Sequence, residues 1–136
     1  MIAESRDDFS FSGLKTSVRY FLRDHPALLD DPRQVRDLCA SVQAAIVDVL
    51  VTKTLRAARR LAVSCVTVSG GVACNRALRQ QLGDGCRGAG LELRVASKNL
   101  CTDNAAMIGV LAEQKLLRGA PESVHTQDVL PGWTLS

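Results

Sequence analysis

The segment Ser69-Gly70-Gly71-Val72-Ala73-Cys74-Asn75 separates a strand-like run from a helix-like run and decides the fold class of this chain. The residues that lead into it, Val63–Ser69, are mostly β-branched or small, which predicts a short buried strand. From Ala73 to about Leu82 the apolar residues have helical spacing. A Gly-Gly turn at such a junction lets backbone N–H groups approach a ligand closely, and the following helix N-terminus attracts anions. The alternative is an ordinary tight turn between two elements.

The side chain of Asn75 strengthens the functional interpretation of this turn. Asn75 lies four residues after Gly71, where the predicted helix makes its first turn beside the backbone donors. A carboxamide offers both donors and acceptors, so it is able to contact a ribose hydroxyl, a phosphate or an acyl group. We therefore take Gly70, Gly71 and Asn75 as candidate nucleotide-binding residues.

A second junction of the same kind follows further along the chain. Leu91–Val95 predicts another strand, and Cys101-Thr102-Asp103-Asn104-Ala105-Ala106-Met107 leads into a helix expected to start at Thr102 or Asp103 and to end at Leu117, before Gly119. Thr, Asp and Asn are also the preferred helix caps, so simple capping is the alternative. An ionised carboxylate at Asp103 is the ligand that a hard or borderline metal needs. The two junctions together predict a nucleotide and metal crevice at the carboxyl ends of parallel strands.

The remaining elements complete an α/β pattern. Alternation over Asp8–Ser12 predicts a short strand, Leu14–Arg23 a helix, and Asp24–Asp30 a loop. Asp31 as N-cap and Pro32 at the first position begin a long helix that reaches Leu61. Four glycines predict a loosened end of the next helix and a turn: Gly83, Gly85, Gly88 and Gly90. We expect about four helices and few parallel strands, a sheet so small that a missing part or a partner must complete it.

Composition sets wider bounds on the function. The 136 residues suit a single domain, 1–136, with an irregular tail over 120–136. A net charge of +3 permits a nucleic-acid partner without requiring one. No run of about 18 apolar residues occurs, so we expect no membrane span. Five cysteines without a CxxC pair predict reduced, buried thiols and a cytoplasmic location.

For the histidines and for the basic residues of the long helix, the sequence predicts solvent exposure rather than a specific chemical role. His25 and His125 are separated from other ligand-type residues, and we interpret them as surface side chains. Lys53, Arg56 and Arg60 share a helix face by their spacing. That face is predicted to be solvated, with contact to a phosphate backbone as the alternative.

Four segments in order resemble one known family. They are Asp8–Thr16, Ser41–Leu50 with Lys53-Thr54, Ser69–Asn75 and Cys101–Met107. Their order and spacing are similar to the C-terminal half of TsaD-type tRNA N6-adenosine threonylcarbamoyltransferases, once called the glycoprotease family. The likeness runs from about Asp8 to Gly119, and Pro131–Leu135 loosely resembles the family's end.

The resemblance implies a fold, a reaction and a set of ligands. The fold is a partial lobe of an actin/Hsp70-like, ribonuclease H-like ATPase. The reaction moves a threonylcarbamoyl group from threonylcarbamoyl-AMP to N6 of adenosine 37 in tRNAs that read ANN codons. The family's nucleotide-contacting asparagine falls on Asn75, its close-approach turn on Gly70 and Gly71, and its metal-binding aspartate on Asp103. In the family that aspartate joins two histidines of an HxxxH motif on one divalent ion, iron in preference to zinc.

The chain departs from the family in one respect that bears on activity. Its 136 residues contain no HxxxH motif. We expect it to lack the family's N-terminal lobe as well. The metal site is therefore expected to be incomplete, and transfer to need an N-terminal half or other subunits. The alternatives are a non-catalytic α/β interaction subunit and a truncated gene product of the same family.

Overall fold

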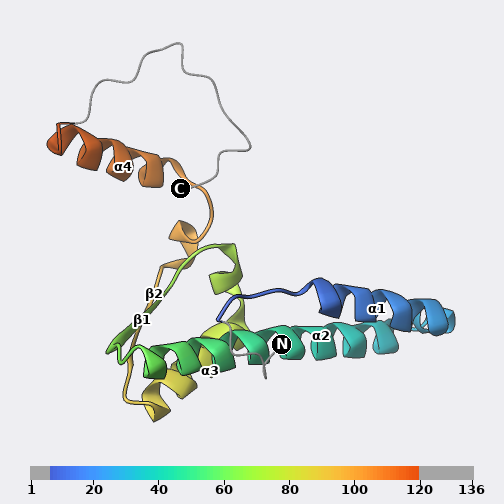
Figure 1. Ribbon diagram of the computed structural model, residues 1–136. Helices are drawn as coiled ribbons and strands as arrows, with labels where there is room; N and C mark the ends of the chain where they lie inside the picture. Colours follow the sequence, from blue (N-terminus) through green and yellow to red (C-terminus); the bar gives the residue numbers. More distant parts are fainter. Residues whose placement is uncertain (1–6, 120–136) are drawn as a thin grey trace. The chain divides into compact units, whose positions relative to one another are not determined.

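The structure, a computed structural model, describes residues 7–119 (Figure 1). The chain falls into two units, Met1–Thr102 and Asp103–Ser136, which are described separately below. The prediction of one domain over 1–136 stays a prediction. The predicted tail 120–136 lies outside the described residues, and so do His125 and Pro131–Leu135.

The described residues form four α-helices and one two-stranded parallel sheet, as the α/β prediction required. The first unit contains, in order, α1 (Ser12–Asp24), η1 (Pro26–Asp30), α2 (Pro32–Arg60), β1 (Cys65–Val68), η2 (Gly71–Cys74), α3 (Arg76–Gly88), β2 (Glu92–Val95) and η3 (Lys98–Leu100). The second unit contains α4 (Ala105–Leu117). The element η1 is a 3-10 helix in the segment predicted to be a loop. This arrangement agrees with a partial α/β lobe of the actin/Hsp70-like class.

The long helix α2 begins where its sequence signals predict. Asp31 is the N-cap, and its carboxylate accepts a hydrogen bond of 2.8 Å from the backbone N–H of Arg33. That bond, and a second one from Gln34, hold the pKa of Asp31 below its ordinary value. By length and composition α2 is long and apolar enough to cross a membrane, with a mean hydropathy of 1.5 over an 18-residue stretch. Core helices of soluble proteins pass the same test, so the absence of a membrane span stays a prediction.

The N-terminal strand predicted over Asp8–Ser12 is wrong. No strand lies within this segment, and α1 already begins at Ser12. Lys53 of α2 holds the segment instead, because its ammonium donates a 2.8 Å hydrogen bond to the Asp8 carbonyl. Lys53 is only 2% exposed, so the solvated face predicted for it is wrong as well. Its neighbours Arg56 and Arg60 pair with the carboxylate of Asp7, the first described residue.

The core of the first unit lies on one face of the sheet. Strands β1 and β2 pair in parallel with Val66 opposite Leu93, and α2 and α3 pack against them (Figure 1). Val66 points into this core, whereas Thr67 and Arg94 point to the other face and are exposed. Parallel sheets are normally covered on both faces. Within the described residues of the first unit this sheet is covered on one face only, so β1 is less buried than its sequence predicts.

Helix α3 does not loosen at its glycines. It continues through Gly83 and Gly85 to Gly88. The reason lies in packing, because a Cβ at Gly85 would lie 2.6 Å from Cδ1 of Leu55 on α2. Gly85 is therefore a point of close approach between α3 and α2, and the prediction of a loosened end is wrong.

We expect Gly85→Val to destabilise the chain by about 1–3 kcal/mol, because the added methyl groups would overpack this contact with Leu55. Gly83→Ala is the matched control, since a Cβ there meets Leu93 at an ordinary 3.9 Å. That variant is expected to gain up to about 1 kcal/mol from helix propensity. Urea unfolding followed by circular dichroism measures both changes. Equal stability of the two variants would contradict the close packing of α2 and α3.

Candidate functional site

The Gly-Gly turn leaves the carboxyl end of β1 with an open backbone. Gly70 has φ +86° and ψ 171°, a conformation that essentially only glycine adopts. Its carbonyl accepts a 3.0 Å hydrogen bond from the N–H of Ala73, which closes the first turn of η2. Gly71 has no such backbone requirement, and a Cβ at either glycine would meet no heavy atom within 4 Å. Nothing in the described chain therefore demands glycine at position 71, which leaves room there for an external molecule.

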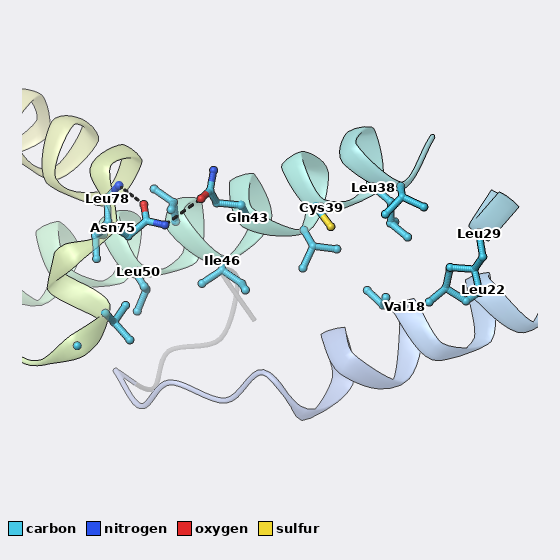
Figure 2. Close-up of a pocket in the computed structure, with 15 residues that line it drawn as sticks. Val18, Leu22, Leu29, Leu38, Cys39, Gln43, Ile46, Leu50, Asn75 and Leu78 are labelled. Carbon is cyan, nitrogen blue, oxygen red and sulfur yellow. Dashed lines mark hydrogen bonds between the residues drawn. The ribbon is translucent and has the colours of Figure 1, made fainter. Parts of the chain in front are cut away.

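Asn75 is fixed at the start of α3 by two hydrogen bonds. It is the N-cap, so α3 begins at Arg76 rather than at the predicted Ala73, which lies in η2. Its Oδ1 accepts 3.0 Å from the backbone N–H of Leu78, and its Nδ2 donates 2.9 Å to Oε1 of Gln43 on α2 (Figure 2). Sequence reasoning assigned no role to Gln43, because 32 residues separate it from Asn75 and no local pattern links them.

A large apolar groove adjoins this end of α3. Its volume is about 850 Å³, and it runs between α1 and α2 with Gly71, Val72 and Asn75 contributing to its lining. Figure 2 shows aliphatic side chains from both helices along it, with Gln43 and Asn75 joined by their hydrogen bond. Apolar lining with a few placed polar groups is typical of small-molecule sites. The same surface also suits a covering protein segment, so the groove alone does not decide between these uses.

Arg79 connects the two loops that follow the strands, a role that the sequence did not reveal. Its Nη2 donates 2.9 Å to the carbonyl of Ala96, just after β2. Its Nε donates to the carbonyl of Ala73, just after β1. The same Nη2 lies 3.5 Å from Sγ of Cys101, and that thiol lies 3.5 Å from the Ala96 carbonyl. The contacts of Arg79 span 6 to 22 residues in the sequence, so helical periodicity could not predict them.

At the second junction, one residue caps α4 and a different residue carries an exposed carboxylate. The structure places the N-cap of α4 at Asn104, whose Oδ1 accepts 3.2 Å from the N–H of Met107. The prediction that α4 starts at Thr102 or Asp103 is therefore off by two or three residues, since Ala105 is the first helical position. Asp103 is exposed and lines a small hollow with Met107 and Ile108. It belongs to the second unit, so the structure describes it separately from Gly70, Gly71 and Asn75.

Within residues 7–119 no group of three His, Cys, Asp or Glu side chains is placed to hold a metal ion. His25 is exposed, stacks on Phe21 and shares a 2.9 Å hydrogen bond between its Nδ1 and the Phe21 carbonyl, as expected of a surface histidine. The described part of the chain therefore forms no complete metal site by itself. The role of Asp103 as a metal ligand stays a prediction.

The cysteines are free thiols, as predicted, but not all are buried. Cys86 and Cys101 are buried, whereas Cys39 is exposed on α2. Burial, followed by the nearby Cys65, raises the pKa of the Cys86 thiol. Cys86 therefore remains protonated and unreactive at neutral pH, which makes it a useful internal reference for folding.

Fold and site together define an α/β lobe with an open glycine turn at the carboxyl end of β1. A family model described as TsaD, tRNA N6-adenosine threonylcarbamoyltransferase, matches residues 2–110. The chain belongs to this family. Curated relatives of that name are 48% identical over 128 residues in Geobacter metallireducens, 46% over 128 in Geotalea uraniireducens and 43% over 125 in Chlorobium phaeobacteroides. These alignments cover 91–94% of this chain but only 35–37% of each relative.

Proposed function

We propose that this chain is the nucleotide-holding part of a tRNA N6-adenosine threonylcarbamoyltransferase. The observation that carries the proposal is the turn at Gly70 and Gly71, open to solvent beside the fixed amide of Asn75. It stands in a chain of the TsaD family, whose curated relatives carry the transferase name. Those names favour the enzyme over the alternative of a non-catalytic interaction subunit.

The proposed reaction is an acyl transfer from threonylcarbamoyl-AMP to tRNA. The exocyclic N6 of adenosine 37 attacks the carbamoyl carbonyl carbon and forms a new C–N bond. The bond from that carbon to the phosphate oxygen breaks, AMP leaves with the electron pair, and N6 releases one proton to solvent. The chain contributes binding and orientation, which reduce the entropic part of the barrier.

Two groups of the chain would hold the adenylate. Backbone N–H groups at the Gly-Gly turn and at the start of α3 offer donors to an anion, and the dipole of α3 favours its charge. Asn75 uses one acceptor position for Leu78 and one donor for Gln43. A carboxamide has two of each, so one N–H and one lone pair remain for the ribose, the phosphate or the acyl group.

We also propose that a companion segment completes the lobe and the metal site. Helix α4 supports this, because its described apolar side chains are exposed, Met107, Ile108 and Leu111 among them. The uncovered face of the sheet and the groove beside α2 support it too. The companion would supply the HxxxH ligands that join Asp103 on one divalent ion, iron in preference to zinc. Cytoplasmic location and tRNA as the partner belong to the same proposal.

Reconstitution tests this function directly. The companion is the part of the Geobacter metallireducens relative that precedes its matched region, co-expressed with this chain; we call the product the reconstituted pair. Purified tRNA and threonylcarbamoyl-AMP are added, and threonylcarbamoyladenosine is measured by mass spectrometry. We expect the pair to modify tRNA at least about tenfold faster than the chain alone, which is expected to stay near background.

A covalent fusion of the same two parts is the control for failed assembly. If the folded fusion also leaves tRNA unmodified, the proposed function is wrong. If the chain alone modifies tRNA as fast as the pair, the need for a companion is wrong.

A further inference from the structure

We propose that Arg79 is a positioning residue that holds the loop after β1 and the loop after β2 in one fixed arrangement. Both loops belong to the first unit, so their contacts are described directly. The consequence for ligand binding rests on the function proposed above, because the loop after β1 carries the Gly-Gly turn.

The guanidinium of Arg79 suits this role by its shape. Its Nε and Nη2 donate to one carbonyl from each loop, those of Ala73 and Ala96. A guanidinium is planar and presents its donors in a rigid fork, so two acceptors bound to it are held at a fixed separation. The Cys101 thiol joins the same cluster through Nη2 and the Ala96 carbonyl. Three backbone or side-chain groups from two loops thus converge on one side chain.

Further contacts transmit this arrangement to the candidate ligand-binding groups. Ala73 is 1% exposed, and its N–H binds the Gly70 carbonyl while its own carbonyl binds Arg79. The glycine turn is therefore held near the C-terminal end of η2, by Arg79 at Ala73 and by the capping bond of Asn75. The Cys74 thiol lies 3.9 Å from the Lys98 carbonyl and adds a weaker tie between the same loops.

Cysteine reactivity tests the arrangement in the 136-residue chain itself. Native protein is treated with iodoacetamide, and peptide mass spectrometry reports the alkylation rate at each thiol. We expect Arg79→Ala to increase the rate at buried Cys101 about tenfold, because the two hydrogen bonds from Arg79 that hold its loop are lost. Cys86, buried in the core between α3 and the sheet, should stay protected, and exposed Cys39 should react quickly in every variant.

Two further variants separate positioning from general destabilisation. Arg79→Lys keeps the charge but lacks the planar fork, so an intermediate rate at Cys101 is expected. Arg87→Ala on the same helix removes only an exposed pair with Asp84 and should leave Cys101 protected. An unchanged rate at Cys101 in Arg79→Ala overturns the proposal, and so does a parallel increase at Cys86, which would report unfolding.

Nucleotide affinity then tests the functional consequence. Binding of AMP to the reconstituted pair is measured by calorimetry for the wild type, Arg79→Ala and Arg87→Ala. We expect Arg79→Ala to weaken AMP binding about tenfold and Arg87→Ala to leave it unchanged. Faster alkylation of Cys101 together with an unchanged AMP affinity would refute the positioning role. Absence of AMP binding in the wild-type pair would instead count against the proposed function, while alkylation still decides the loop arrangement.

Discussion

Gly71→Val is expected to weaken nucleotide binding by the reconstituted pair at least about tenfold while leaving the stability of the chain nearly unchanged. The reason is that Gly71 has an ordinary backbone conformation and a Cβ there meets no heavy atom within 4 Å. The chain itself therefore tolerates a side chain at this position. A ligand held close to the backbone N–H groups would collide with it. Calorimetric AMP binding and thermal unfolding of the same samples measure the two effects.

Gly70→Val is the comparison variant, because it separates an effect on stability from an effect on nucleotide affinity. Gly70 has φ +86°, so a β-branched residue there is strained by about 1–3 kcal/mol whatever the surrounding space. This variant should lose both stability and affinity, whereas Gly71→Val should lose affinity alone. If Gly71→Val binds AMP as tightly as the wild type, the open turn is not the nucleotide site.

Asp103→Ala is expected to remove the bound metal from the reconstituted pair, with affinity reduced at least about a hundredfold. Removing a residue that only hydrogen-bonds a metal ligand typically lowers metal affinity 10–100-fold. Removing a direct ligand should therefore lower it by at least as much. The chain alone should bind iron or zinc weakly with or without Asp103, because the described residues hold no three-ligand group. Metal content after gel filtration is measured by mass spectrometry.

The adjacent Asn104 provides a control with the opposite pattern. Asn104 caps α4 through the N–H of Met107, so Asn104→Ala should weaken that helix by about 1 kcal/mol. Its effect on metal content should be small, because the carboxylate of Asp103 remains. Equal metal loss in both variants would indicate that the junction collapses as a whole, and retention of metal in Asp103→Ala would exclude Asp103 as a ligand.

The sequence predicted well those features that depend on a few neighbouring residues. The start of α2 follows from Asp31 and Pro32, because a cap and a preset φ act within one turn. Both parallel strands and the last helix followed from periodicity and glycine signals. The strand predicted over Asp8–Ser12 failed because alternation alone does not supply a neighbouring strand to pair with.

Features that depend on packing could not be predicted from the sequence. The tight approach of Gly85 to Leu55 keeps α3 helical where glycines indicated loosening. The burial of Lys53 depends on the Asp8 carbonyl, 45 residues away in the chain. Neither Lys53 nor Asp8 is marked by spacing or residue type as a partner of the other, so the helical pattern predicts a solvated lysine.

By itself, then, the sequence determined the α/β class, the family and the turn at Gly70 and Gly71, because local backbone chemistry and ordered motifs carry that information. Only the tertiary structure showed that Gln43 fixes Asn75 and that Arg79 joins the two loops. The physical reason is that such hydrogen bonds require close contacts between segments far apart in the chain, and those contacts exist only after α2, α3 and the sheet have packed.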